Sequence, residues 1–179
     1  MDEARLEEGQ SGVEPAGGGW FVVNVGDSAW RTSDAFGSAT RFESGDAPFQ
    51  QLGINIRVLN PGQPNCLYHR ESLQEDFLVL HGECLLLVEG EERRLRAWDF
   101  VHLPPGTDHV FVGAGDGPCA ILMTGARSED EELHYPVSEL AARHDASATE
   151  ATDSPEAAYA RYEASRPGRP AGWDALPWA

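Results

Sequence analysis

A succession of short apolar segments, separated by glycine and proline turns, fills the chain from residue 20 to residue 125. From Leu52 to Val58, apolar residues occupy every second position, and this period of two is typical of a strand with one buried face. Asn60 to Gly62 forms a turn, and a second proline-glycine turn lies at Pro104 to Gly106. No helical pattern of useful length interrupts the region. The fold is therefore expected to be all-β, as a sandwich or a barrel.

The segments on either side of this region have a different composition. Residues 1–19 are acidic and then rich in glycine, so we expect a disordered leader there. The barrel is expected over residues 20–126, and a tail with one or two short helices over residues 127–179. Trp173 and Trp178 lie near the end of this tail. Because they have apolar surface to bury, we expect them to pack on the barrel or on a second subunit, and we expect a homodimer.

The charge of the chain argues against several kinds of partner. Its 30 acidic and 13 basic residues give a formal net charge of −17, which repels nucleic acid and anionic membranes. No stretch approaches the roughly 20 apolar residues of a membrane-spanning helix. The acidic start at Met1 to Ala4 lacks the pattern of a signal peptide. We therefore expect a cytoplasmic protein whose partner is a small molecule.

Four residues in the middle of the chain are of metal-ligand type. Strand alternation places His69, Glu71 and Glu75 on one side, if the strand is extended or bulged by an even count. The proline-glycine turn that follows presents His109 at the start of a strand. Two imidazoles with one or two carboxylates suit iron, manganese, nickel or zinc. The sequence therefore predicts one divalent metal ion held by His69, Glu75 and His109, with Glu71 as a fourth ligand.

The segment that contains these residues resembles the first conserved motif of the cupin superfamily. Glu75 and Gly82 have the spacing of the motif. The histidine pair of the motif is replaced here by His69 and Glu71, which makes the predicted metal site more anionic.

The second cupin motif follows at a short distance along the chain. Pro104, Gly106 and His109 match it, whereas Trp98 replaces its glycine and Gly113 replaces its asparagine. The resemblance covers roughly residues 50–125. It implies a metal-binding cupin with the double-stranded β-helix fold, a form of jelly roll, and leaves the reaction open because cupins have many activities.

Three residues are expected to act beside the metal. Glu71, if it is not a ligand, is a carboxylate able to take a proton from a bound hydroxyl group or water. His102 lies two residues before the Pro104 turn and is expected to face the cavity as a proton donor. Arg57 could reach the barrel mouth and bind a substrate carboxylate, with an ordinary surface arginine as the alternative.

The spacing of the predicted ligands is similar to that of the iron site of 3-hydroxyanthranilate dioxygenase, which is itself a cupin. The arginines expected to bind the carboxylate of that substrate are replaced by Asn65 and Gly113. The first functional hypothesis is an iron-dependent dioxygenase that acts on a small organic molecule. The alternatives are a metal-dependent isomerase, epimerase or decarboxylase, and a cupin without enzymatic activity that binds a small molecule.

Overall fold

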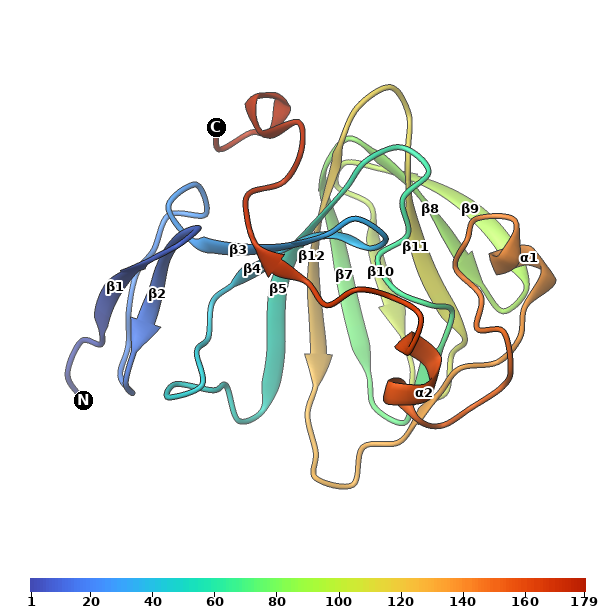
Figure 1. Ribbon diagram of the computed structural model, residues 1–179, viewed down its shortest axis with the longest axis horizontal. Helices are drawn as coiled ribbons and strands as arrows, with labels where there is room; N and C mark the ends of the chain where they lie inside the picture. The colour runs from blue at the N-terminus through green and yellow to red at the C-terminus, as the bar shows by residue number, and fades with distance from the viewer.

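A computed structural model describes residues 1–179 of the protein (Figure 1). The strands of the N-terminal half are β1 (Arg5–Gly9), β2 (Gly12–Ala16), β3 (Ala29–Ser33), β4 (Gly37–Arg41), β5 (Leu52–Leu59), β6 (Arg70–Glu71), β7 (Glu75–His81) and β8 (Glu83–Val88). Those of the C-terminal half are β9 (Glu91–Arg96), β10 (Phe100–Leu103), β11 (His109–Ala114), β12 (Cys119–Ala126), β13 (Leu133–His134) and β14 (Arg166–Pro167). The helices are α1 (Glu139–Ala142), α2 (Pro155–Tyr159) and the 3-10 turn η1 (Trp173–Ala175).

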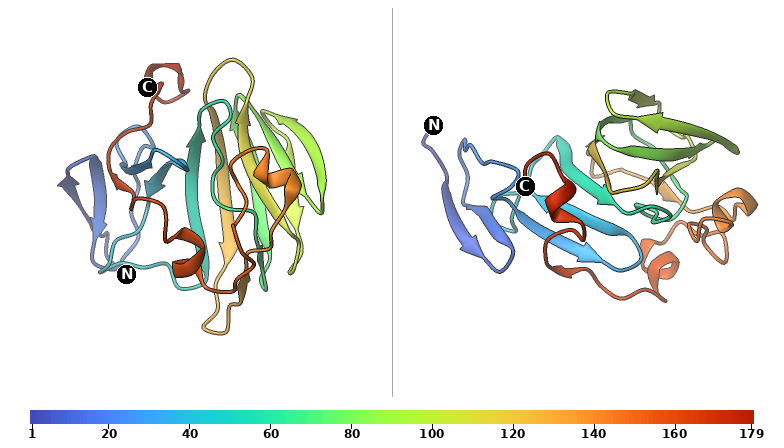
Figure 2. Two further views of the ribbon diagram at one scale, coloured as in Figure 1. Left: turned by 45° about the vertical axis from the view of Figure 1, so that its right-hand side comes forward. Right: turned by 90° about the horizontal axis from the view of Figure 1, so that it is seen from above.

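Two walls of antiparallel strands face each other, as the view from above shows (Figure 2). The larger wall is a seven-stranded sheet in the order β10-β7-β12-β5-β4-β3-β14, and the smaller wall has the order β11-β8-β9. The chain before β6 runs beside β11, because His69 and His109 exchange backbone hydrogen bonds of 3.1 and 2.7 Å. From β7 to β12 the chain passes repeatedly from one wall to the other. The expectation of an all-β core is confirmed.

The apolar core lies between the two walls. Leu59, Val79 and Phe111 are among its fully buried members and come from β5, β7 and β11. Both walls therefore contribute side chains to one cluster, which seals one end of the space between them. At roughly 25 cal/mol per Å² of apolar surface, this burial is the main stabilising contribution to the fold.

A second apolar cluster covers the outer face of the large sheet. Trp30 has no exposed surface, and its ring lies 5.8 Å from the rings of both Trp173 and Trp178. Ile56 and Val58, on the outward side of β5, belong to the same cluster. The tail thus buries its tryptophans on its own chain. Their apolar surface no longer requires a second subunit, which was one reason to expect a homodimer.

The short helices expected in the tail are present. Ser138 caps α1 by accepting a hydrogen bond from the backbone N–H of Ala141, and Ser154 caps α2 in the same way. Pro155 is the first residue of α2, where its missing N–H costs nothing.

The N-terminal segment differs from the disordered leader that its composition predicts. Residues 1–19 contain the hairpin of β1 and β2, which pair from Arg5 with Ala16 to Gly9 with Gly12. Val13 donates a backbone hydrogen bond to Asp27, and Ala4 donates one to Trp20, so the hairpin is attached to the following loop. The prediction of disorder rested on the small number of apolar residues in this segment. It took no account of backbone hydrogen bonds, which do not depend on side-chain type.

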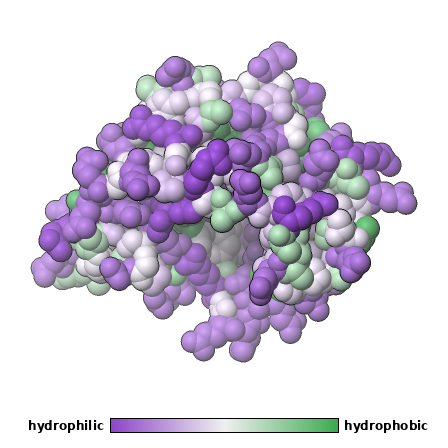
Figure 3. Space-filling view, viewed as in Figure 1, coloured by the Kyte–Doolittle hydropathy of each residue, from purple (hydrophilic) through white to green (hydrophobic).

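The surface agrees with the acidic composition. Hydrophilic residues dominate the face in Figure 3, with hydrophobic ones scattered between them. Trp98 and Phe100 are exceptions: Trp98 is 74% exposed just before the edge strand β10, and Phe100, its first residue, is 65% exposed. No helix of the protein is both long enough and apolar enough to cross a bilayer.

Candidate metal centre

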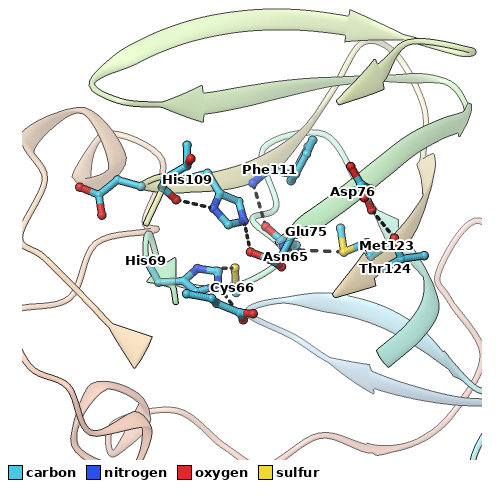
Figure 4. A network of polar contacts seen from close by, with 12 residues as sticks. Asn65, Cys66, His69, Glu75, Asp76, His109, Phe111, Met123 and Thr124 are labelled. Carbon is cyan, nitrogen blue, oxygen red and sulfur yellow. Dashed lines mark hydrogen bonds and ion pairs between the residues drawn. The ribbon is translucent and has the colours of Figure 1, made fainter. Parts of the chain in front are cut away.

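Three side chains converge at one end of the space between the walls. The possible ligand atoms of His69, Glu75 and His109 all lie within 4.8 Å of one another. Nε2 of His109 lies 3.2 Å from a carboxylate oxygen of Glu75, and the two imidazole centroids are 4.8 Å apart (Figure 4). Two imidazole nitrogens and one carboxylate at this separation suit a divalent transition metal. The donor set therefore fits the metal that the sequence predicts.

The positions of these residues follow from the local backbone. Glu75 and His109 are the first residues of β7 and β11, which belong to opposite walls. Gly106, in the turn before His109, has a φ of 83°, a conformation that few residues other than glycine adopt readily. Trp98 lies at the place where the cupin motif has glycine, and it adopts a φ of 78°, a conformation that favours glycine.

Backbone carbonyl groups hold both imidazoles in one orientation. Nδ1 of His69 lies 2.9 Å from the carbonyl oxygen of Leu67, and Nδ1 of His109 lies 3.0 Å from that of Thr107. An Nδ1–H that donates to each carbonyl leaves Nε2 with its lone pair. This arrangement orients metal-binding histidines in many proteins, because it fixes both tautomer and ring direction.

Burial and neighbouring charges shift the pKa values of the site. Burial, and then the charge of Glu71, raise the pKa of Glu75 to about 7. Burial, and then the charge of His69, lower the pKa of His109 to about 4. Burial and a hydrogen bond with Glu71 raise the pKa of Glu131, a third carboxyl group at the same place. Crowded carboxyl groups share protons when no cation is present.

Glu71 lies at the edge of the three-residue cluster. One of its oxygens is 3.5 Å from Nε2 of His69, but Glu71 is outside the group whose donor atoms are mutually close. Burial raises the pKa of Glu71, but the hydrogen bond and charge of His69, with a hydrogen bond from Glu131, together outweigh it, so the pKa lies below its ordinary value. The structure thus places Glu71 where it can either ligate or act as a base.

A cavity of about 340 Å³ contains the cluster. Its walls combine the polar residues of the site with apolar side chains such as Phe77, Met123 and Leu133. Two larger hollows lie on the surface, and one of them adjoins the cavity because Glu71, Glu131 and Leu133 line both, but neither includes His69 or His109. The cavity is small for an enzyme site, since such sites typically measure about 300–1,000 Å³.

The structure corrects the expectation that His102 faces the cavity. Its side chain is half exposed on the outer side of β10, and its Nδ1 lies 2.7 Å from a carboxylate oxygen of Asp76. Val101 and Leu103 on either side pack against the core. Because side chains alternate along a strand, His102 must point outward. His102 is therefore not part of the site.

Arg57 lines the cavity, which excludes the alternative of an ordinary surface arginine. It lies on the inward side of β5, where it pairs with Ile121 of the neighbouring strand β12. Burial lowers the pKa of the guanidinium. The only hydrogen bond that the guanidinium donates goes to the backbone oxygen of Phe36, at 3.3 Å.

The tail contributes cavity residues that the sequence analysis did not predict. Glu131, Tyr135 and Tyr159 all line the cavity, although they follow the two cupin motifs by many residues. The Tyr135 ring stacks on His69 at 5.7 Å, and the Tyr159 hydroxyl accepts a hydrogen bond from Leu67 N–H. No local pattern marks these positions, because they reach the site only through the path of the tail. Cys66, with its sulfur 3.6 Å from Nδ1 of His69, is a fourth unpredicted neighbour.

Comparison with known proteins identifies the central region. Residues 55–125 match the cupin domain family. No curated protein matches the sequence significantly. Among solved structures, a sugar phosphate isomerase of the cupin superfamily from Silicibacter pomeroyi has a TM-score of 0.57 and 25% identity, covering 66% of this chain and 82% of that chain.

Two further structures have lower identity. A polyketide cyclase from Streptomyces resistomycificus has a TM-score of 0.51 and 16% identity, over 61% of this chain and 87% of that chain. A candidate sugar phosphate isomerase from Acidithiobacillus ferrooxidans has a TM-score of 0.45 and 24% identity; the match covers 47% of this chain and 55% of that chain, about half its length. The double-stranded β-helix fold of the cupins is confirmed.

Proposed function

We propose that this chain, whose residues 55–125 match the cupin domain, is a metal-dependent enzyme that acts on a small organic molecule. The observation that carries the proposal is the convergence of His69, Glu75 and His109 within one cavity. A divalent metal bound there would supply a Lewis acid with open coordination positions. Apolar side chains such as Phe77 and Met123 would exclude water from the bound molecule.

The first reaction that we propose is iron-dependent dioxygenation, for which a face of two histidines and one carboxylate is suited. The ligand spacing resembles 3-hydroxyanthranilate dioxygenase, but we do not propose that substrate. Asn65 accepts a hydrogen bond from Phe111 N–H, and a side chain at Gly113 would meet the backbone oxygen of Asn60 at 2.1 Å. Asn65 thus supports the backbone of β11, and Gly113 has no room for a side chain.

A second reaction is a metal-dependent isomerisation. It is supported by the similarity to the isomerase from Silicibacter pomeroyi, and by the carboxyl groups of Glu71 and Glu131 that lie together beside the cluster. Such a pair can move a proton between two positions of a bound molecule.

Metal analysis with oxygen uptake tests the proposal. Protein as purified is expected to contain one iron, manganese, nickel or zinc ion per chain. Removal of the ion by a chelator should lower the melting temperature by about 5–11 °C, for an ion present at about 100 times its Kd. Oxygen consumption with a panel of catechols and aminophenols would support the dioxygenase, and its absence would favour the isomerase. Protein that binds none of these metals would contradict both.

The role of Glu71 is tested by Glu71→Gln. We expect the variant to keep its metal, because Glu71 lies outside the mutually close donor atoms, and to lose turnover, because the amide cannot accept a proton. Metal content and activity are measured on the same sample. A large loss of metal would show instead that Glu71 is the fourth ligand.

The oligomeric state and location remain predictions. A homodimer is supported by the exposed Trp98 and Phe100 beside the edge strand β10, and light scattering that gives a monomeric mass at high concentration would contradict it. Cytoplasmic location likewise remains a prediction, and fractionation of the cells that produce the protein tests it.

A further inference from the structure

Arg57 occupies an unusual position for a charged residue. Residues that pair directly across β5, β12 and β7 form rows that run across the sheet. Three successive rows are Gly53–Gly125–Glu75, Asn55–Met123–Phe77 and Arg57–Ile121–Val79. Directly paired residues face the same side of a sheet, so Arg57 lies beside the core residues Ile121 and Val79. Arg57 is therefore at the apolar floor of the cavity, and Glu75 is two rows away.

No other arginine of the cavity is without an anionic partner. All 13 basic residues of the chain are arginines, and only Arg57 and Arg127 line the cavity. Arg127 donates to both carboxylate oxygens of Glu43, at 2.8 and 2.6 Å, and to the carbonyl of Phe49. Its charge is thus compensated, and the charge of Arg57 is not.

Two polar atoms on this floor are without partners. Nε of Arg57 has no hydrogen-bond acceptor and is buried from solvent. Oδ1 of Asn55, one row closer to Glu75, is buried and has no donor. An unpaired charge or polar atom at a buried position costs stability, and proteins retain such groups where they have a function.

We infer that the cavity binds a small carboxylate whose anionic group pairs with Arg57 and whose neighbouring hydroxyl or amino group donates a hydrogen bond to Asn55. This proposal deepens the proposed function, since it gives the substrate class of the same cavity. Anion binding at Arg57 does not itself require the metal, so the two proposals can fail separately.

The arrangement of the cavity sets the orientation of such a molecule. The rows of Arg57 and Glu75 are four residues apart along β12, roughly 13 Å at about 3.3 Å per residue. The end near Glu75 carries the carboxyl groups of Glu71 and Glu131 as well, and these repel an anion. A carboxylate is therefore directed to the floor, and the uncharged end of the molecule lies toward the metal centre.

A carboxylate matches this floor better than a phosphate group does. The planar fork of one guanidinium pairs with the two oxygens of a carboxylate, and its single charge compensates a single negative charge. A phosphate group carries more negative charge and needs further hydrogen-bond donors. The unpartnered atom of Asn55 on this floor is an oxygen, which is an acceptor. The cavity of about 340 Å³ also favours a compact molecule.

The first test is the stability of Arg57→Met, which keeps most of the side-chain volume and removes the charge. In a buffer without carboxylate or phosphate, we expect the variant to melt several degrees above the wild type, because a partly buried guanidinium without an anionic partner is gone. Arg127→Met is the matched control and should melt at or below the wild type, since it leaves Glu43 without its partner. A destabilised Arg57→Met would mean that Arg57 is structural.

The second test is binding, measured by calorimetry on metal-free and metal-loaded protein. The probes are benzoate, salicylate and pyruvate, with salicylamide as the neutral analogue and inorganic phosphate as the competing anion. We expect salicylate to bind best, and its affinity to fall on the order of 10- to 100-fold in Arg57→Met, less in Arg57→Lys and under about 3-fold in Arg127→Met. Equal binding of salicylamide, tighter binding of phosphate, or no binding of any carboxylate would overturn the inference. Arg57-dependent binding by a protein that takes up none of the four metals would contradict only the proposed function.

Discussion

His69→Ala is expected to lower the affinity for the metal by more than about 100-fold, which exceeds the loss typical of residues that only support a ligand. The variant loses one of the three donors that converge in the cavity, and no other imidazole is close enough to replace it. The fold should remain, because His69 is outside the cluster that fills the space between the walls. Metal content by elemental analysis, together with a circular dichroism spectrum, measures both effects.

His102→Ala is the matched control. It removes an imidazole of the same domain that points to solvent and pairs with Asp76. This variant should keep its full metal content. Full occupancy in His69→Ala, or loss of metal in His102→Ala, would contradict the assignment of the site.

Trp30→Ala is expected to lower the free energy of unfolding by about 3–5 kcal/mol. The side chain is fully buried between Trp173 and Trp178, and its removal leaves a cavity that neither ring can fill without leaving the sheet. For a protein of this length, the melting temperature should fall by roughly 6–20 °C. Thermal and urea unfolding of the metal-free protein measure the change without a contribution from the ion.

Trp20→Ala provides the comparison for this variant. Trp20 is 51% exposed, so its loss should cost less than about 1 kcal/mol. If both substitutions lowered the free energy of unfolding by a similar small amount, the packing of the tail would not depend on Trp30. Increased proteolysis of the tail in Trp30→Ala alone would support the packing described above.

The clustering of His69, Glu75 and His109 could be predicted because their positions follow from short-range rules. Glu75 and Gly82 are related by one strand, and His109 follows a turn of fixed type, so spacing along the chain reports distance in space. The direction of His102 could have been predicted in the same way. Val101 and Leu103 are apolar on either side of it, and alternation then requires the histidine to face outward.

The rest of the site depends on contacts that no local pattern records. The apolar side of β5 was expected to be the buried one, yet the tail covers that side and the cavity lies on the other. Because the sheet is covered on both faces, Arg57 lies in the interior. The apolar residues on either side of it in the sequence suggested that it faced solvent. Tyr135 and Tyr159 reach the cavity only because the tail passes its mouth. The hairpin of residues 5–16 likewise depends on backbone bonds rather than composition.

The separation between the three donor residues and part of the cavity wall has a consequence for how such a protein can diverge. His69, Glu75 and His109 belong to the two motifs of the domain, whereas Tyr135 and Tyr159 come from a segment that packs on the domain from outside. Mutations in that segment that keep the Tyr135 stacking on His69 and the Tyr159 hydrogen bond to Leu67 can reshape the chamber while the donor atoms stay in place. The shape of the cavity can thus change through the C-terminal segment while the three donor residues of the domain are kept.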